Sequence, residues 1–172
     1  MKVVLHDLEP SRFESLYPKL ARDSFIVGEE GPVRNCVGCF GCWCKTPGKC
    51  VIPDGYGDFG KRLGACGEYL ILSRVVYGGF SPFVKNVLDR NIGYILPFFE
   101  LRKGEMHHKP RYPDRFRLRV FGYGEEVSPE EQAVFRRLAE ANGLNLNAQS
   151  VTVRLLSLIH IYLNAGVWLL NG

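Results

Sequence analysis

Short apolar runs alternate with helical segments along most of this sequence, and this alternation constrains the fold more than any other feature. Residues 69–72 form a continuous apolar run, which is typical of a strand covered on both faces in a parallel sheet. Further strands are predicted at 2–6, 24–27, 118–122 and 151–156, with helices at 11–20, 54–66, 81–90 and 128–143. Alternation of this kind predicts an α/β fold, in which a parallel sheet carries helices on both faces.

Polar residues support two of the predicted helix starts. Ser11 and Glu14 form a predicted capping box, in which each side chain bonds the backbone N–H of the other, and Ser128 and Glu131 form a second. Gly143 is expected to end the last helix, because glycine readily adopts the left-handed conformation found at helix C-termini.

The net charge of +4 is concentrated in one segment of the 172 residues, a length that suits one domain but not two. Residues 102–119 contain seven Lys and Arg against two Asp and Glu, whereas the rest of the chain is close to neutral. A nucleic-acid-binding domain usually carries a basic patch together with a high overall charge, so nucleic acid is not an expected partner. The segment is expected to be a local anion-attracting site or a solvated loop.

No membrane span or secretory signal is predicted. The most apolar stretch, residues 155–170, is interrupted by Ser157, His160, Asn164 and Gly166 and is shorter than the ~20 residues that a span needs. The first residues resemble a short strand followed by acidic residues and a proline, which is not the pattern of a signal peptide. We therefore expect a cytoplasmic protein with no membrane partner.

Five of the six cysteines lie within fifteen residues, at positions 36, 39, 42, 44 and 50. Three closely spaced thiols and a more distant fourth are typical of a [4Fe-4S] cluster, here held by Cys36, Cys39, Cys42 and Cys50. Zinc sites more often pair two separated C-x2-C units, and disulfides need an oxidising compartment. The remaining alternative is a shaped loop of reduced thiols without a metal.

The cysteine segment, residues 35–50 followed by Asp54, resembles the cysteine loop of flavodoxin-like NAD(P)H-dependent FMN reductases and iron-sulfur flavoproteins. Residues 69–81, together with Lys85 and residues 88–90, are similar to the strand, flavin-contacting loop and helix of the same group. The resemblance implies a flavodoxin-like, doubly wound, five-stranded parallel sheet of order 2-1-3-4-5, with helices on both faces.

The resemblance also implies FMN at the carboxyl edge of the sheet, NAD(P)H as electron donor, a small-molecule or protein electron acceptor, and a homodimer. The implied cofactor-binding residues are Ser11, Ser73, Arg74, Val76, Tyr77, Gly78, Gly79, Gly122, Tyr123 and Gly124. Tyrosine can stack on a flat flavin ring, and glycine lets backbone N–H groups approach it. The long loop predicted at 91–115, with His107 and His108, is expected to be a lid over the flavin, a dimer contact, or a loop that packs its aromatic residues on the sheet.

The loop after the first strand departs from the family pattern. In the family this loop contains Ser, Thr and Gly residues that bind the FMN phosphate at a helix N-terminus. Here residues 6–11 include Asp7 and Glu9, which would repel a phosphate. Ser11 still offers a hydroxyl group, and Arg74 offers a compensating positive charge.

Two function classes remain open. One is an FMN-dependent oxidoreductase or electron carrier that accepts electrons from NAD(P)H and holds a [4Fe-4S] cluster. The other is a flavin-less flavodoxin-like module, which acts in dimerisation or as the partner of a second domain. The flavodoxin-like domain is expected at 1–156, with its cysteine-rich loop at 35–50. Residues 157–172 are expected to be an edge strand or the start of a second domain.

Overall fold

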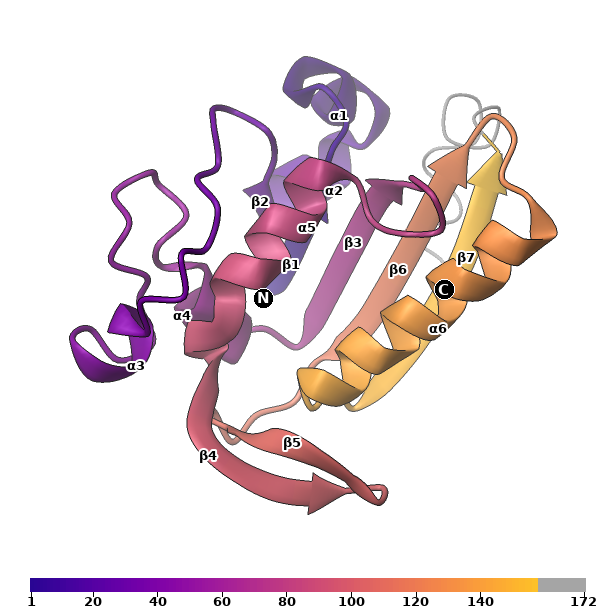
Figure 1. Cartoon of the computed structure of the whole chain (residues 1–172). Coiled ribbons are helices and arrows are strands. Elements are labelled where there is room, and N and C mark those ends of the chain that lie inside the picture. Colours follow the sequence, from indigo (N-terminus) through magenta and orange to yellow (C-terminus); the bar gives the residue numbers. More distant parts are fainter. Residues whose placement is uncertain (158–172) are drawn as a thin grey trace.

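The computed structural model describes residues 1–157, so residues 158–172 of the predicted apolar tail lie outside the described residues. A parallel sheet of five strands forms its centre, in the order β2-β1-β3-β6-β7 (Figure 1). The strands are β1 (Lys2–His6), β2 (Ser24–Val27), β3 (Glu68–Arg74), β6 (Arg117–Gly124) and β7 (Ser150–Ser157). Without the separate β4–β5 hairpin this is the predicted order 2-1-3-4-5, which confirms the predicted fold class.

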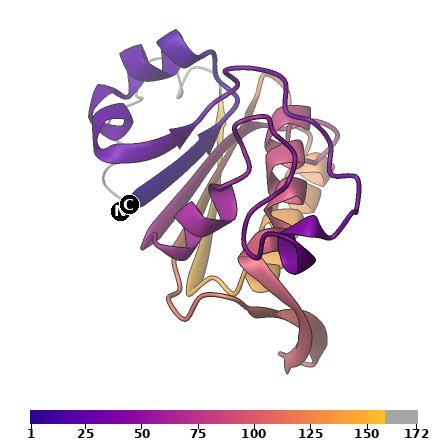
Figure 2. The same cartoon turned by 90° about the vertical axis from the view of Figure 1, so that its left-hand side faces the viewer.

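Helices cover both faces of the sheet, as Figure 2 shows from the β2 edge. The helices are α1 (Pro10–Leu16), α2 (Pro18–Asp23), α3 (Gly41–Cys44), α4 (Phe59–Gly64), α5 (Pro82–Asp89) and α6 (Pro129–Asn145), and η1 (Arg90–Tyr94) is a 3-10 helix. None of the described helices is long and apolar enough to cross a membrane.

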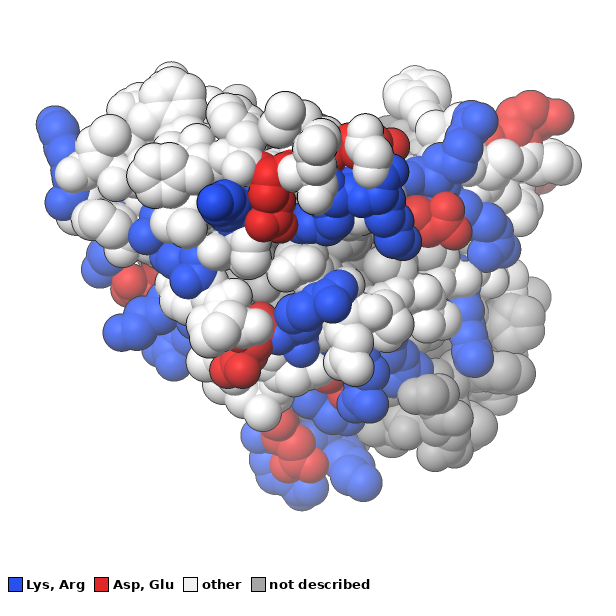
Figure 3. Space-filling model, turned by 90° about the horizontal axis from the view of Figure 1, so that it is seen from below, with Lys and Arg blue, Asp and Glu red and all other residues white. Residues whose placement is uncertain are grey.

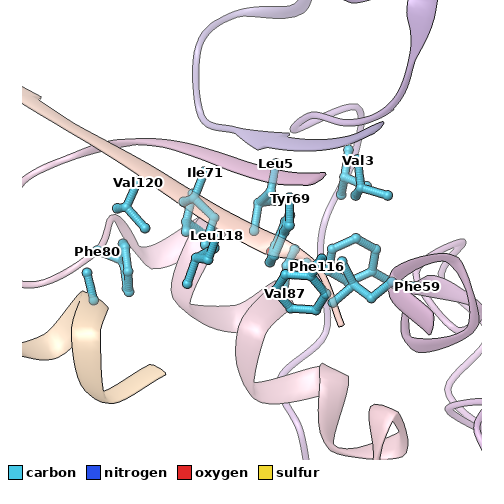
Figure 4. Close-up of a cluster of buried hydrophobic side chains, with 14 of the residues drawn as sticks. Val3, Leu5, Phe59, Tyr69, Ile71, Phe80, Val87, Phe116, Leu118 and Val120 are labelled. Carbon is cyan, nitrogen blue, oxygen red and sulfur yellow. The ribbon is translucent and has the colours of Figure 1, made fainter. Parts of the chain in front are cut away.

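Side chains of the central strand β3 alternate between two apolar cores. Tyr69 and Ile71 pack on the face covered by α4, α5 and α6, where Figure 4 shows them among other buried side chains. Leu70 and Leu72 pack on the face covered by α1 and α2. The strand is therefore buried on both faces, as its continuous apolar sequence predicted.

Two predicted helix ends differ from the structure. The capping box of Ser128 and Glu131 starts α6 as predicted, but the helix continues two residues beyond Gly143, to Asn145. A Cβ atom at Gly143 would lie 2.2 Å from a methyl carbon of Val151, so this glycine allows α6 to approach β7 closely rather than ending the helix. The helix predicted at 54–66 is shortened to α4.

Helix α1 begins earlier than predicted. Its N-cap is Glu9, whose carboxylate accepts hydrogen bonds from the backbone N–H groups of Ser11 and Arg12. Pro10 takes the first helical position, for which its fixed φ is suited. The capping box predicted from Ser11 and Glu14 is therefore wrong.

The long loop predicted at 91–115 is also wrong for most of its length. It contains η1 and a hairpin of two antiparallel strands, β4 (Ile95–Arg102) and β5 (Glu105–Pro110), which lies at the bottom of Figure 1. Lys103 and Gly104 form its two-residue turn, with positive φ angles of 51° and 82°. Positive φ at both central positions is the geometry that suits a tight hairpin.

Candidate functional site

The carboxyl ends of β1, β3 and β6 meet at one edge of the sheet, where ligands bind in folds of this topology. A hollow of about 600 Å³ lies between the segments that follow β3 and β6. Arg74 and Val75 line it from one side, and Tyr123, Gly124 and the segment 125–127 line it from the other. Three glutamates, Glu125, Glu126 and Glu131, give this hollow a negative lining.

At β1, the side chain of Asp7 turns onto the edge of the sheet. Its Oδ2 atom accepts a hydrogen bond of 2.8 Å from the backbone N–H of Arg74, and its Oδ1 atom accepts one of 2.9 Å from the Tyr123 hydroxyl. One carboxylate therefore links the ends of β1, β3 and β6. The Arg74 N–H and the Tyr123 hydroxyl therefore already have an anionic partner within the chain, the carboxylate of Asp7.

The N-terminus of α1 is occupied in the same way by Glu9. This carboxylate accepts hydrogen bonds from the Ser11 N–H, the Arg12 N–H and the Ser11 hydroxyl. The pKa of Glu9 lies below its usual value, and the hydrogen bond from the Ser11 hydroxyl is the largest cause. The hydroxyl group that the sequence assigned to a phosphate is therefore bonded to a carboxylate of the chain.

The loop after β3 forms a tight turn of its own. Val76 and Gly79 pair across it, and Tyr77 and Gly78 between them have φ angles of 50° and 74°. Tyr77 is 94% exposed, so its ring is free to meet a ligand but packs on little of the protein. Ser73 is buried below the turn, where its hydroxyl accepts a hydrogen bond from the Ser81 N–H.

The two glycines at the carboxyl end of β6, Gly122 and Gly124, allow close packing. A Cβ atom at Gly122 would lie between 2.6 and 2.9 Å from side-chain atoms of Phe135, Leu155 and Val75. A Cβ atom at Gly124 would lie 2.6 Å from Val127. The space beside both glycines is thus filled by the protein.

The four cysteines of the predicted cluster differ in their surroundings. Cys36 and Cys39 are exposed, Cys42 is buried on α3, and Cys50 is half-buried. Burial raises the pKa of Cys42, and the nearby thiols of Cys50, Cys36 and Cys39 raise it further. Across residues 1–157, no three His, Cys, Asp or Glu side chains are arranged to hold a metal ion. The [4Fe-4S] cluster is therefore not shown and stays a prediction, and we derive no chemistry from one.

A buried ion pair fixes the cysteine loop, and sequence reasoning did not identify it. The Arg90 guanidinium binds both carboxylate oxygens of Asp54 and also donates to the Arg34 carbonyl and to the Cys50 Sγ atom, at 2.9 and 3.2 Å. Arg90 lowers the pKa of Asp54 to about 2. Asp54 and Arg90 both belong to the segments that resemble the family. This resemblance was the signal in the sequence that could have pointed to the pair. Beside the pair, a second hollow of about 500 Å³ lies near the end of β2 and is lined in part by Gly28, Arg34 and Asp54.

Comparison with known proteins identifies the fold. A scan against protein-family profiles and a search of curated proteins give no match. Solved structures do match. An NAD(P)H:quinone oxidoreductase from Methanothermobacter marburgensis is similar over 91% of this chain and 86% of its own, with a TM-score of 0.57 and 11% identity. An azoreductase from Bacillus anthracis str. Sterne is similar over 94% and 89%, with a TM-score of 0.57 and 8% identity.

A third structure, general stress protein 14 from Treponema denticola in complex with FMN, is similar over 91% of this chain and 85% of its own, with a TM-score of 0.53 and 8% identity. The fold is flavodoxin-like. The predicted resemblance to flavodoxin-like NAD(P)H-dependent FMN reductases is thus confirmed at the level of the fold.

The flavodoxin-like fold implies FMN, and the residues of this chain do not fit its phosphate. The implied phosphate position is the turn between β1 and α1, where the family uses free N–H and hydroxyl donors. In this flavodoxin-like domain, Glu9 binds the donors of Ser11 and Arg12, and Asp7 binds the N–H of Arg74. We therefore derive no reaction step through FMN.

Proposed function

We propose that the chain is a flavodoxin-like domain of a flavin-dependent NAD(P)H oxidoreductase and that it acts there as a partner domain without an FMN of its own. Its likeness in fold to a quinone oxidoreductase and an azoreductase supports the class of enzyme. One observation carries the second part: the carboxylates of Asp7 and Glu9 bind the donors of the phosphate position.

The argument has two steps, and the first concerns hydrogen bonds. An anion binds at a helix N-terminus because several backbone N–H groups there have no partner within the helix. In α1, two of these groups already donate to Glu9, at 3.0 and 2.9 Å. A phosphate would have to displace that carboxylate before it gained either bond.

The second step concerns charge. A phosphate in this turn would lie close to two carboxylates, and like charges at such distances repel each other. Arg74 contributes only its backbone N–H to the binding of Asp7, so its side chain remains as a nearby positive charge. Arg12, whose charge also acts on Glu9, is a second. Two arginines still balance less charge than Asp7, Glu9 and a phosphate dianion bring together.

A second candidate function is an FMN-holding reductase that transfers electrons from NAD(P)H to a small-molecule or protein acceptor. The hollow between the segments after β3 and β6 favours it, because this is where the flavin ring is expected. The Treponema denticola protein was solved with FMN. In this second case the flavin ring would have to supply most of the affinity for FMN, because the phosphate position is taken by carboxylates of the chain.

Flavin titration tests the proposal. The purified chain is incubated with FMN and, separately, with riboflavin, which has the same ring but no phosphate, and the bound fraction is measured by equilibrium dialysis. We expect no FMN to co-purify with the chain and FMN to bind no more tightly than riboflavin. Stoichiometric FMN in the purified chain would overturn the proposal in favour of the second candidate.

Variants at the two carboxylates sharpen the test. Asp7→Asn with Glu9→Gln removes both negative charges, and we expect FMN to gain affinity while riboflavin does not. Glu14→Gln is the matched control, because Glu14 is an exposed glutamate on the same helix, away from its N-terminus. An equal effect of the control would show that net charge alone is responsible.

A further inference from the structure

The thiol of Cys50 lies between a buried guanidinium and a hollow in the surface. Its Sγ atom accepts a hydrogen bond of 3.2 Å from the Nε atom of Arg90. Arg90 is buried, with 1% of its side chain exposed, and it is held in place by both carboxylate oxygens of Asp54. Cys50 is half-buried and lines a third hollow, of about 410 Å³, together with Thr46 and Pro53. A small molecule in this hollow would therefore lie beside Cys50.

The contact with Arg90 favours reaction at Cys50. A cysteine reacts as a thiolate, and a cationic donor that bonds to the sulfur stabilises its negative charge. A guanidinium keeps its own charge at every ordinary pH, and the pairing with Asp54 fixes the direction of the Nε–H bond. Reactive cysteines lie in partly exposed, electropositive surroundings of this kind. Cys50 therefore has the surroundings of a nucleophile.

Cys42 places a second thiol near the first. The N–H of Gly48 donates to the Cys42 carbonyl at 2.9 Å, which closes the loop that joins Cys42 to Cys50. Burial raises the pKa of Cys42, and among the neighbouring thiols that of Cys50 raises it most. Cys42 is only 6% exposed, so a dissolved reagent reaches Cys50 more easily. An accessible thiol beside a sheltered one is the arrangement in which the second thiol can resolve an adduct on the first.

A pair of thiols needs less convergence than a metal site. In the part of the chain that the structure describes, no three potential ligands are arranged to hold a metal ion, but a disulfide joins only two sulfurs. Structural disulfides are rare in the cytoplasm, whereas transient ones occur there in catalysis and redox sensing. The expected cytoplasmic location therefore argues against a permanent disulfide and not against a reversible one.

We propose that Cys50 and Cys42 form a redox-active dithiol that reacts with small, negatively charged disulfides. The Cys50 thiolate attacks one sulfur of the small disulfide, which breaks its S–S bond and releases one thiol. Cys42 then loses its proton and attacks the sulfur of Cys50, which forms the Cys42–Cys50 disulfide and releases the second thiol. The two cysteines give up two electrons and two protons, and the small disulfide takes them up. This inference goes beyond the proposed function and does not depend on whether the domain holds a flavin.

Charge around the loop favours a negatively charged disulfide. Residues 31–53 contain Arg34, Lys45 and Lys49 but no Asp or Glu. The Trp43 indole donates to two carbonyls at the base of the hairpin, so the loop adjoins the side of the molecule on which the hairpin lies. Figure 3 shows that side from below, with Lys and Arg spread over it. A surface of this charge attracts anions and raises their local concentration.

Tryptic digestion gives a direct measurement of the link. Cleavage after Lys and Arg places Cys50 on peptide 50–61 and the other four thiols of the loop on peptide 35–45. The reduced full chain is treated with glutathione disulfide, which is negatively charged, and the remaining thiols are blocked before digestion and mass spectrometry. We expect the two peptides to be linked, and fragmentation should place the link between Cys42 and Cys50.

Variants separate the roles of the two thiols. In Cys42→Ser, or in Cys42→Ala if the serine disturbs the core, the reaction should stop with one glutathione on Cys50. In Cys50→Ser the link should be absent. Cys44→Ser is the matched control, because Cys44 is a more exposed thiol of the same loop, and this variant should form the link as the wild type does. Circular dichroism confirms the fold of each variant.

The order of reaction tests the part played by Arg90. Exposure alone would make Cys44 react before Cys50, whereas we expect Cys50 to react at least about tenfold faster in the folded chain. Cystamine, a positively charged disulfide, tests the charge of the substrate. Each rate is divided by the rate for the chain unfolded in urea, which removes differences in intrinsic reactivity. Glutathione disulfide should then react faster than cystamine at low salt, and salt should reduce the difference.

Five results would overturn the proposal. They are a wild-type chain without the Cys42–Cys50 link, a link to Cys50 that persists in both Cys42 variants, and first attack at Cys44. The fourth is a faster corrected rate with cystamine at low salt. The fifth is stoichiometric iron and inorganic sulfide in the chain purified without oxygen, which would assign these thiols to a cluster.

Discussion

The loop after β1 and the cysteine loop are each fixed by a carboxylate of the chain, but the two carboxylates lie in different surroundings. Glu9 is exposed and binds backbone N–H groups at the start of α1. Asp54 is buried against the guanidinium of Arg90, with 5% and 1% of the two side chains exposed. A buried charge without its partner is costly, whereas an exposed one is hydrated by water.

The two carboxylates should therefore differ in what their loss affects: the stability of the fold in one case and ligand binding in the other. The Asp54–Arg90 pair holds the cysteine loop against η1, so its loss should affect the whole domain. Glu9 and Asp7 occupy a position at the rim, so their loss should affect mainly which ligand the rim accepts. The following predictions test this contrast, from the largest expected effect to the smallest.

Breaking the buried pair should have the largest effect on stability. Arg90→Ala should lower the free energy of unfolding by about 3–5 kcal/mol, because Asp54 is then a buried charge without a partner. Chemical denaturation followed by circular dichroism measures this. The double variant Asp54→Leu with Arg90→Met is the control and should lose less than Arg90→Ala. An Arg90→Ala variant as stable as the wild type would remove the contrast.

His6, directly below the loop after β1, should make stability depend on pH. It stacks on Phe13 at 3.8 Å, and burial lowers its pKa from 6.5 to about 4. The unfolded chain binds the proton first, so stability is fully present above pH 6.5 and is lost as the pH falls toward 4. The loss should reach about 3 kcal/mol.

Urea denaturation at pH 7, 5.5 and 4.5 checks this expectation, with His6→Gln as the comparison. The variant should show a much smaller change across this range. Asp54 does not interfere, because its pKa of about 2 places its own loss of stability below pH 3.8. Equal slopes in the variant and the wild type would show that another group titrates.

Asp7 should have an intermediate effect. Asp7→Ala removes the acceptor for the Arg74 N–H and the Tyr123 hydroxyl, which should cost about 1–2 kcal/mol. Tyr123→Phe removes one of the two bonds. A double-mutant cycle measured by thermal unfolding should show that the two substitutions are coupled. Strict additivity would mean that the Asp7–Tyr123 bond contributes nothing in solution.

Glu9 should have the smallest effect on global stability. Glu9→Ala removes an exposed helix cap, so the change should be confined to the first turn of α1. Amide hydrogen exchange should be faster at Ser11 and Arg12 and unchanged in β1. Glu14→Ala is the control, and faster exchange throughout the sheet in the Glu9 variant would contradict the contrast drawn above.

Much of this fold was predictable from the sequence because its signals are local. The buried strand β3 has a continuous apolar sequence, and the capping box at Ser128 marks the start of α6. The β4–β5 hairpin was missed because its apolar face is exposed and its polar face is turned toward the protein. The alternation of apolar and polar residues along its strands therefore did not indicate a face packed on the core. Lys103 and Gly104 were the remaining signal, and Lys-Gly is a weaker turn signal than Asn-Gly.

The site was less predictable because its contacts join distant segments. Asp7 and Glu9 were expected to oppose a phosphate, which stays a prediction, and their bonds to Arg74, Tyr123 and Ser11 depend on the folded geometry. Cys50 was assigned to a metal, which stays a prediction, and the hydrogen bond that its sulfur accepts from Arg90 was not foreseen. Sequence spacing brings thiols near each other without fixing where they point. The cytoplasmic location and the homodimer stay predictions.

The position of one side chain has a practical consequence. The indole N–H of Trp43 donates to the carbonyls of Ile92 and Ile95, so this α3 residue also touches the base of the hairpin. The second tryptophan, Trp168, lies outside the described residues. In a Trp168→Phe variant, the fluorescence of Trp43 would report, without an added label, on changes in the surroundings of the thiols and of the hairpin.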